Sequence, residues 1–285
     1  MDDYVALNKA SWDERAPAHA ASPGYAVERF VADPTFLSDV VRFDLPLLGD
    51  VTGLRGVHLQ CHIGTDTISL SRLGARMTGL DFSSAALEQG RALAAATGSE
   101  VDFVEADVFD AATVLDPGSF DLVFTGIGAL CWLPDVRRWA GVVADLLVPG
   151  GRLFIREGHP MLWALADARP DELLVVDHPY FEQVEPLVWD EGGTYVETDV
   201  EFVHNTTHEW NHGLGEIVTA LMDAGLTITG LTEHDSVPWE ALPGQMTVGP
   251  DGEWRLSERP ERLACSYTLQ ARRPDNVHVT VKPTS

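Results

Sequence analysis

Cysteine is scarce in this sequence. The three cysteines, Cys61, Cys131 and Cys265, lie far apart, and no CxxC pair occurs. An odd number of scattered cysteines is not the pattern of a disulfide framework or of a thiolate zinc site. A protein of the reducing cytoplasm is therefore expected.

Positive charge and long apolar runs are scarce too. Nineteen Lys and Arg residues face 44 Asp and Glu residues, which gives a formal net charge of -25. Nucleic acids bind basic surfaces, so neither DNA nor RNA is an expected partner. The acidity would mildly favour cationic ligands, but a solvated acidic surface that maintains solubility is the better explanation, so the net charge indicates no substrate. The first residues are acidic and no run of about 18 uncharged apolar residues occurs, so neither an export signal nor a membrane span is expected.

What the sequence does contain is a regular alternation of short apolar runs and amphipathic segments. The 285 residues, 45% hydrophobic and 22% charged, suit one large globular domain. Strands are predicted at residues 57–61, 77–80, 101–104, 120–125, 152–155, 226–231 and 266–271, and helices at 66–73, 85–96, 135–147 and 214–224, with a Pro-Gly-Gly turn at 149–151. Such alternation is typical of βαβ units. We predict an α/β, Rossmann-like fold with a seven-stranded, mostly parallel sheet and helices on both faces.

Two segments depart from this pattern. Residues 1–50 have apolar side chains at helical spacing, which predicts an N-terminal helical lid. Residues 157–210 are rich in proline and aromatics and alternate polar with apolar side chains at 195–203, which predicts an antiparallel cap inserted after the fifth strand. The main domain would then span residues 51–273, followed by a tail at 274–285 that lacks core-forming periodicity.

Polar residues at three successive strand ends carry the predicted chemistry. The first strand runs through residues 60–67 into a helix, where Gly64 permits close backbone approach and the helix N-terminus attracts an anion. Asp81 ends the second strand, where a carboxylate can accept the hydroxyls of a ribose. Asp107 follows the third strand, where an acceptor can meet an adenine amino group. Each acid alone is readily explained as a helix cap, but the three features together indicate an adenosine-type ligand.

Four segments carry a family resemblance: HLQCHIGTDTISLSRLGARMTGLDFS, VEADVFD, FDLVFTGIGALCWLPD and LVPGGRLFIREGHP. Over roughly residues 57–159 the sequence resembles the class I S-adenosylmethionine (SAM) dependent methyltransferases. The resemblance implies SAM as cofactor. It places the methionine part at Gly64 and its neighbours, the ribose at Asp81, the adenine at Asp107 and Val108, and the sulfonium near Gly126 and Ile127. The implied cofactor-binding set is Gln60, His62, Gly64, Thr65, Asp66, Thr67, Asp81, Phe82, Ser83, Asp107, Val108, Gly126 and Ile127.

One position of the resemblance differs from the family pattern. The family loop usually reads GxGxG, whereas Gln60 and His62 stand here at the first two glycines and only Gly64 remains. The loop matches an HLQCH-type variant found in methyltransferases. Residues with a Cβ do not freely adopt the positive φ angles that glycine allows, so the sequence does not establish the backbone geometry of this loop.

The implied reaction needs little chemistry from the protein. The cofactor carries an activated methyl group, so the chain chiefly has to align an O, N or C nucleophile of a small molecule. If that nucleophile must lose a proton, His159 and Glu157, directly after the fifth strand, are the candidate bases, His159 first. The alternative for His159 is a loop histidine whose ring hydrogen-bonds to backbone.

Aromatic and histidine side chains of the cap region are the predicted substrate contacts. Tryptophans recur at 132, 163, 189, 210 and 239, where they would wall a pocket or anchor loops. His204, His208 and His212 have the four-residue spacing of a helical zinc site. However, a strand pattern precedes His208 and Gly213 follows His212, which favours a strand, a turn and a helix start. We therefore expect no metal, and expect substrate contacts from Trp132, Trp163, His208, Trp210 and His212, with Glu209 beside them.

Two other functions compete with methyl transfer. An NAD-dependent oxidoreductase also has an acid after its second strand, but it requires a GxGxxG turn that residues 60–65 lack. A SAM-binding protein without catalysis would share the cofactor pocket. Nothing in the sequence indicates the identity of the substrate or an oligomeric state.

Overall fold

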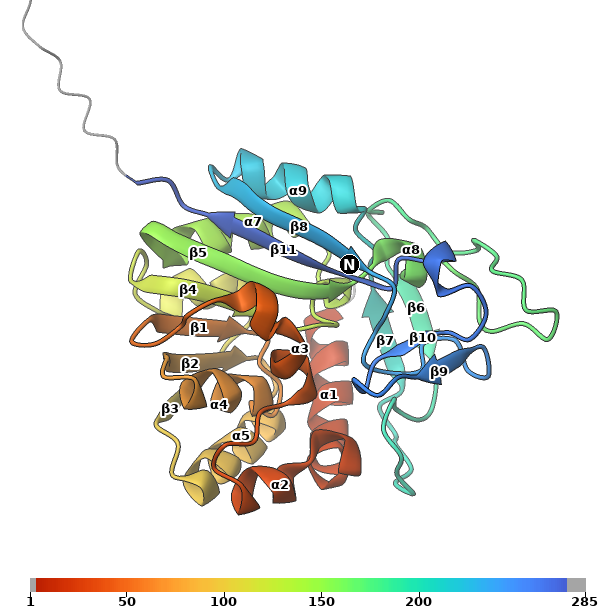
Figure 1. The fold of residues 1–285 in the computed structure, drawn as a ribbon, viewed down its shortest axis with the longest axis horizontal. Coiled ribbons are helices and arrows are strands. Elements are labelled where there is room, and N and C mark those ends of the chain that lie inside the picture. The colour runs from red at the N-terminus through yellow and green to blue at the C-terminus, as the bar shows by residue number, and fades with distance from the viewer. Residues whose placement is uncertain (1–3, 276–285) are drawn as a thin grey trace, which may run out of the picture.

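A seven-stranded sheet forms the centre of the computed structural model, which describes residues 4–275 (Figure 1). Its order is β3-β2-β1-β4-β5-β11-β8. The strands are β1 (Arg55–Leu59), β2 (Arg76–Asp81), β3 (Val101–Glu105), β4 (Phe120–Thr125), β5 (Leu147–Gly158), β8 (Thr227–His234) and β11 (Ser266–Arg272). β11 pairs antiparallel with β5 and β8, and the other neighbours pair parallel. This architecture confirms the predicted Rossmann-like fold.

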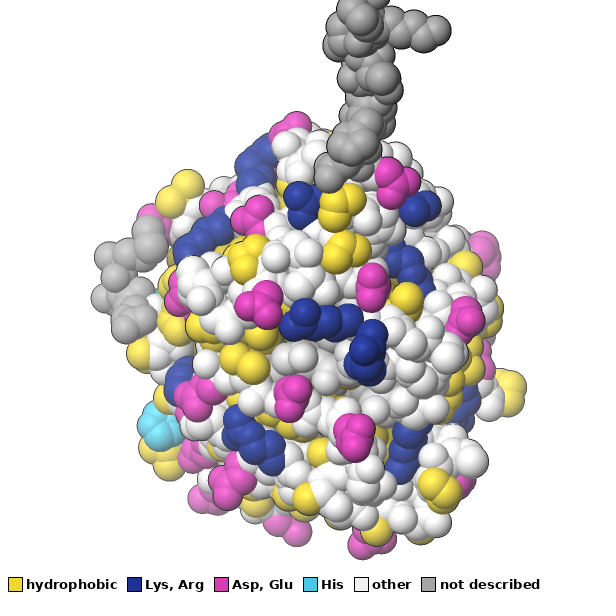
Figure 2. All heavy atoms as spheres, turned by 90° about the vertical axis from the view of Figure 1, so that its left-hand side faces the viewer, with side chains coloured by type: hydrophobic (Ala, Val, Ile, Leu, Met, Phe, Trp, Pro, Cys, Tyr) yellow, Lys and Arg dark blue, Asp and Glu magenta, His cyan; other side chains and the backbone are white. Residues whose placement is uncertain are grey.

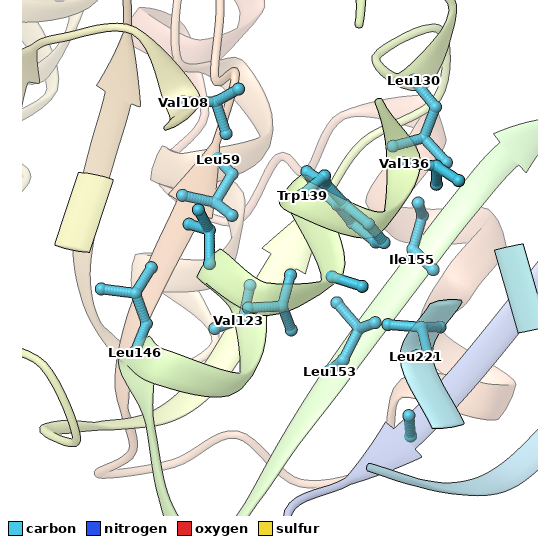
Figure 3. Packing of buried hydrophobic residues seen from close by; sticks show 14 of the residues in the cluster. Leu59, Val108, Val123, Leu130, Val136, Trp139, Leu146, Leu153, Ile155 and Leu221 are labelled. Carbon is cyan, nitrogen blue, oxygen red and sulfur yellow. The ribbon is translucent and has the colours of Figure 1, made fainter. Parts of the chain in front are cut away.

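Helices cover both faces of the sheet, as predicted. On one face lie α6 (Ala111–Val114), α7 (Val136–Leu146) and α9 (Leu214–Asp223), and on the other α3 (Asp39–Leu48), α4 (Thr65–Arg72) and α5 (Ser84–Thr97). Figure 3 shows Trp139 of α7 among apolar side chains of β4 and β5, including Val123, Leu153 and Ile155. Their complete burial makes this cluster the main core.

Local sequence explains how the central helices begin and end. The Asp135 carboxylate accepts a hydrogen bond from the Arg138 N–H at the start of α7, and the Ser83 hydroxyl does the same for Ala86 in α5. Gly98 ends α5 in the left-handed conformation, where a side chain would be strained. The predicted turn at 149–151 lies within the bounds of β5, where the register with β4 shifts.

The N-terminal residues are helical, as expected. They form α1 (Tyr4–Ala21), η1 (Pro23–Tyr25), α2 (Val27–Ala32) and α3. α1 lies between the sheet and the cap and packs against α5 (Figure 1). It also holds β7 (Thr206–Glu209), because Asn8 accepts from the His208 N–H and donates to the His208 carbonyl, both at 2.9 Å.

The cap is antiparallel, but its strands are not where the alternation predicted one. β6 (Leu187–Asp190) pairs with β7, while residues 195–203 are irregular. That segment packs on α1 instead of a partner strand, with the Arg15 guanidinium 4.6 Å from the centre of the Phe202 ring. The other elements on this side of the molecule are α8 (Pro160–Trp163), β9 (Met246–Val248), β10 (Trp254–Leu256) and η4 (Pro260–Arg262). Most of the predicted tail lies outside the described residues.

The surface shows mixed charge at the amino ends of the parallel strands. Figure 2 looks onto that side of the molecule, where Lys and Arg side chains stand among Asp and Glu. No helix within residues 4–275 is long and apolar enough to cross a membrane.

Candidate active site at the carboxyl edge of the sheet

The loop after β1 has the backbone shape of a glycine loop without its glycines. Gln60, His62 and Gly64 all have positive φ angles, of 57°, 51° and 74°. Only the last position demands glycine sterically, because a Cβ on Gly64 would lie 2.7 Å from the Phe103 ring. Gln60 and His62 thus adopt, with their side chains, the left-handed conformation that the family pattern assigns to glycine.

Side-chain hydrogen bonds hold these two residues in place. The Gln60 amide donates to the Ala129 carbonyl at 2.9 Å, and His62 Nε2 lies 2.9 Å from Nδ1 of His19 in α1. His19 in turn contacts the cap, with the Tyr195 hydroxyl 3.3 Å from its Nδ1. Burial lowers the pKa of His19 to about 4, so the ring is neutral at pH 7. The sequence offered no signal for this contact between α1, the loop and the cap.

The start of α4 can receive an anion. Its N-cap is Gly64, and within the described part of the chain no side chain caps this end. The N–H groups of the first turn therefore keep their capacity to bind a carboxylate, in line with the helix dipole.

Asp81 joins two loops at the end of β2. Its side chain is buried, with the residue 6% exposed, and it accepts hydrogen bonds from the N–H groups of His62 and Ser83, both at 2.8 Å. Burial raises the pKa of Asp81 to about 6, against the effect of these bonds. A carboxylate has about four lone-pair sites, so two bonds leave room for ribose hydroxyls.

Asp107 combines the two roles considered for it. Its carboxylate caps the turn η2 (Val108–Asp110) by accepting from the Phe109 N–H at 2.7 Å. The side chain is only partly buried, and burial raises its pKa. Val108 is buried directly beside it. Asp107 therefore caps the turn and also presents a hydrogen-bond acceptor at the position expected for the adenine of the cofactor.

Helix α1 covers the end of β2. Lys9 Nζ lies 2.5 Å from the Phe82 carbonyl oxygen and 3.2 Å from the Glu105 carboxylate. The Ser83 hydroxyl donates to Asp13 at 2.7 Å. Two predicted residues, Phe82 and Ser83, therefore contact the lid through Lys9 and Asp13, and no sequence pattern predicted these two contacts.

Gly126 brings the end of β4 close to two polar side chains. A Cβ there would lie 3.3 Å from Oδ2 of Asp66 and 3.4 Å from Nε2 of His58. The His58 ring is fixed by Thr67, whose hydroxyl lies 2.9 Å from Nδ1. Burial raises the pKa of Asp66 to about 6. Ile127 packs on the apolar cluster of the cap side.

Glu157 and His159 are engaged within the protein. Glu157 accepts from the backbone N–H groups of residues 128, 129, 130 and 158 at 2.5 to 2.8 Å. His159 accepts from the Met161 N–H at 3.0 Å, and its Nε2 lies 3.0 Å from Glu233. Glu157 therefore clamps the loop after β4, and His159 caps α8.

A cavity of about 340 Å³ lies in the cap. Trp163, Trp210 and Glu209 line it, whereas His208 and His212 lie outside its wall. The His212 ring is held at 2.7 Å by both Glu182 and the Leu133 carbonyl.

Trp132 lies nearer the loop after β1. It packs edge-on against Trp12, at 5.2 Å between ring centres, and Trp12 packs on His62 at 5.0 Å. The indole N–H of Trp132 donates to the Gly128 carbonyl.

The histidine-rich segment is a strand, a turn and a helix start, as expected. β7 ends at Glu209, and Gly213 is the N-cap of α9. His204 contacts Glu14. Residues 4–275 contain no group of three or more His, Cys, Asp or Glu side chains placed to hold a metal ion.

Comparison with known proteins agrees with this geometry. Residues 57–153 match a family model described as a methyltransferase domain. A ubiquinone biosynthesis O-methyltransferase of Xanthomonas euvesicatoria pv. vesicatoria is 30% identical over 159 residues, which cover 54% of this chain and 59% of that protein. The chain thus matches about three fifths of the length of this relative.

Two solved structures have the same fold over most of the chain. A SAM-dependent methyltransferase from Mesorhizobium loti is 26% identical, with a TM-score of 0.58, covering 80% of this chain and 94% of its own. A putative SAM-dependent methyltransferase from Listeria monocytogenes is 15% identical, with a TM-score of 0.60, covering 83% and 97%. The second likeness concerns the fold alone.

Proposed function

We propose that residues 57–153, which match a family model described as a methyltransferase domain, form a class I SAM-dependent methyltransferase domain, and that the chain transfers a methyl group from SAM to an O, N or C atom of a small molecule. The observation that carries the proposal is the convergence of the loop after β1, the buried Asp81 and Asp107 at one edge of the sheet. The scattered free cysteines support a cytoplasmic location.

The residues present fit the cofactor. The uncapped first turn of α4 suits the methionine carboxylate, Asp81 the ribose hydroxyls, and Asp107 with Val108 the adenine. Bound SAM supplies a methyl group on a positively charged sulfur, which needs no further activation. The protein's part is to bind, to align and to exclude water.

Most of the residues assigned to this task position other groups. Glu157 holds residues 128–130, so the loop after β4 is rigid where the acceptor atom must be aligned. Trp132 and Trp12 screen the loop after β1 from the cap side. Because His159 caps α8, we propose that it serves chiefly to place the start of the cap.

The NAD alternative is disfavoured by charge. Asp66 lies in the first turn of α4, half-buried, and its carboxylate faces Gly126. A dinucleotide would place its pyrophosphate at this helix end, against a carboxylate, whereas the zwitterionic methionine part of SAM also offers an ammonium group.

Calorimetric titration with SAM, S-adenosylhomocysteine and NAD tests the proposal. We expect the first two to bind and NAD not to bind. Transfer of label from methyl-labelled SAM to a panel of phenols, amines and acids then separates an enzyme from a SAM-binding protein without catalysis. Binding of NAD without SAM would overturn the assignment.

A further inference from the structure

The cap cavity is lined by side chains from α1, from the segment after β4 and from the cap. Its wall includes Arg15, Cys131, Trp163, Leu165, Trp189, Glu209 and Trp210. Cys131 lies in η3 (Leu130–Trp132), directly after the loop that Glu157 clamps. The cavity therefore borders the edge of the sheet where methyl transfer is proposed. Its volume of about 340 Å³ suits a small molecule.

One face of the β6–β7 pair forms a wall of this cavity. Leu187 pairs with Glu209 and Trp189 pairs with Thr207 across the two strands, and all four side chains line the cavity. Successive strand residues point to opposite faces, so Val188 between them points away and is 58% exposed. The register thus places one carboxylate beside an indole and an aliphatic side chain.

Three indole rings of the wall are held by neighbouring rings. Trp163 stacks on Trp239 at 5.7 Å between ring centres, and Trp189 packs edge-on against His178 at 5.3 Å. Trp210 packs edge-on against Tyr4 at 5.2 Å. Rigid aromatic walls bind apolar bodies, and their faces attract cations.

The charge of the cavity is negative. Glu209 lines it together with the exposed acids Asp167 and Glu191. Among the described lining residues the single Lys or Arg is Arg15.

The guanidinium of Arg15 is already used by the protein. It donates to the carbonyls of Gly193 and His204 at 2.9 and 2.8 Å, to the Ser11 hydroxyl at 2.8 Å and to the Asn205 side chain at 3.1 Å. An anionic ligand would therefore meet carboxylates without a free cation.

We infer that this cavity binds a protonated amine carried by an aromatic or apolar small molecule, with Glu209 as the ionic partner. If the occupant is the methyl acceptor, the inference rests on the proposed function and names its substrate class. Burial and the neighbouring Glu191 raise the pKa of Glu209 to about 7. A bound ammonium group would lower the pKa of Glu209 again, so that the carboxylate is ionised and pairs with the ammonium near neutral pH.

The test compares three probes of one shape and different charge. Phenethylamine, 2-phenylethanol and phenylacetate are titrated into the full chain by ligand-observed NMR, with SAM affinity measured in parallel. We expect the amine to bind at least tenfold more tightly than the alcohol, and the acid not to bind. Glu209→Gln should weaken amine binding by about 10- to 100-fold, whereas Glu197→Gln, an exposed cap carboxylate outside the cavity wall, should not change it.

The outcomes separate this inference from the proposed function. If SAM binds but the amine binds no better than the alcohol, or Glu209→Gln leaves the amine affinity unchanged, the amine site is wrong and methyl transfer stands. If the amine binds as expected and SAM does not, the cavity assignment stands and the proposed function is wrong. The probe series on the wild-type protein decides the matter even where Glu209→Gln does not fold.

Discussion

Asp44 in α3 is a buried carboxyl group without a hydrogen-bond partner. The residue is 1% exposed, and neither oxygen has a partner among the residues that the structure describes. The nearby guanidinium of Arg156 is paired with Glu253 at 2.6 Å, and Phe43 covers it at 3.6 Å. Burial raises the pKa of Asp44 to about 8, with Asp66 and Glu253 adding to the effect and Arg156 opposing it. Removing the ionisable group by Asp44→Asn should therefore stabilise the protein at alkaline pH.

The size and sign follow from proton linkage. The unfolded chain ionises Asp44 near pH 3.8, whereas the folded protein keeps it protonated up to about pH 8. Between these values the folded state binds more protons, so the free energy of unfolding falls as pH rises. About four pKa units at 1.36 kcal/mol each set an upper limit of about 6 kcal/mol. An effective protein dielectric of about 20 makes the burial of a charge less costly than this limit. We therefore expect Asp44→Asn to raise the free energy of unfolding by about 2 to 3 kcal/mol at pH 8.

Guanidinium unfolding followed by tryptophan fluorescence from pH 4 to pH 8 measures this difference. The variant should match the wild type near pH 4 and exceed it progressively toward pH 8. Asp102→Asn, at an exposed position of β3, controls for the change of charge and should follow the wild-type curve. Parallel curves for Asp44→Asn and the wild type would mean that the carboxylate is ionised at its ordinary pKa, stabilised by the charge of Arg156, and the reasoning would be refuted.

Further substitutions test the site. Asp81→Asn should weaken SAM binding in calorimetry by about 10- to 100-fold, because a charged acceptor is lost, and unchanged affinity would remove Asp81 from the cofactor site. Glu157→Gln should lower the free energy of unfolding by about 1 to 3 kcal/mol and speed amide exchange at residues 128–130, whereas unchanged exchange would contradict the clamp. His159→Gln should cost about 1 kcal/mol of stability and leave SAM affinity intact, and a drop in kcat of about 100-fold or more would instead indicate a base. Trp210→Ala should reduce turnover of the substrate without loss of SAM affinity, and equal loss of both would make the cap part of the cofactor lid.

The sheet was predictable because its signals are local. Buried runs such as residues 120–125 and 266–271 alternate with amphipathic helices, and both runs became strands. The prediction of a strand at 195–203 was wrong, because alternating polar and apolar side chains indicate a strand only where a partner strand is available. In the structure that stretch covers α1, and β6 pairs with β7.

The positions of the candidate site residues were predictable only where a residue directly follows a strand. Asp81 and Asp107 could be placed in this way, since parallel strands deliver their carboxyl ends to one edge. His19 is 43 residues from its partner His62, and nothing near it in the sequence marks that contact. Asp44 was missed for the same reason, because only packing reveals that its carboxyl group is buried.

The loop after β1 has a consequence for exchanging parts between related enzymes. A glycine loop offers only backbone, whereas Gln60 and His62 reach the Ala129 carbonyl and His19. A GxGxG loop transplanted from a relative would reproduce the backbone course but would remove the hydrogen bonds that the Ala129 carbonyl and His19 form with the loop. The loop, the first helix and the stretch after β4 are joined by these side chains, so a chimaera that exchanges the loop alone should lose the hydrogen bonds that connect it to the other two segments.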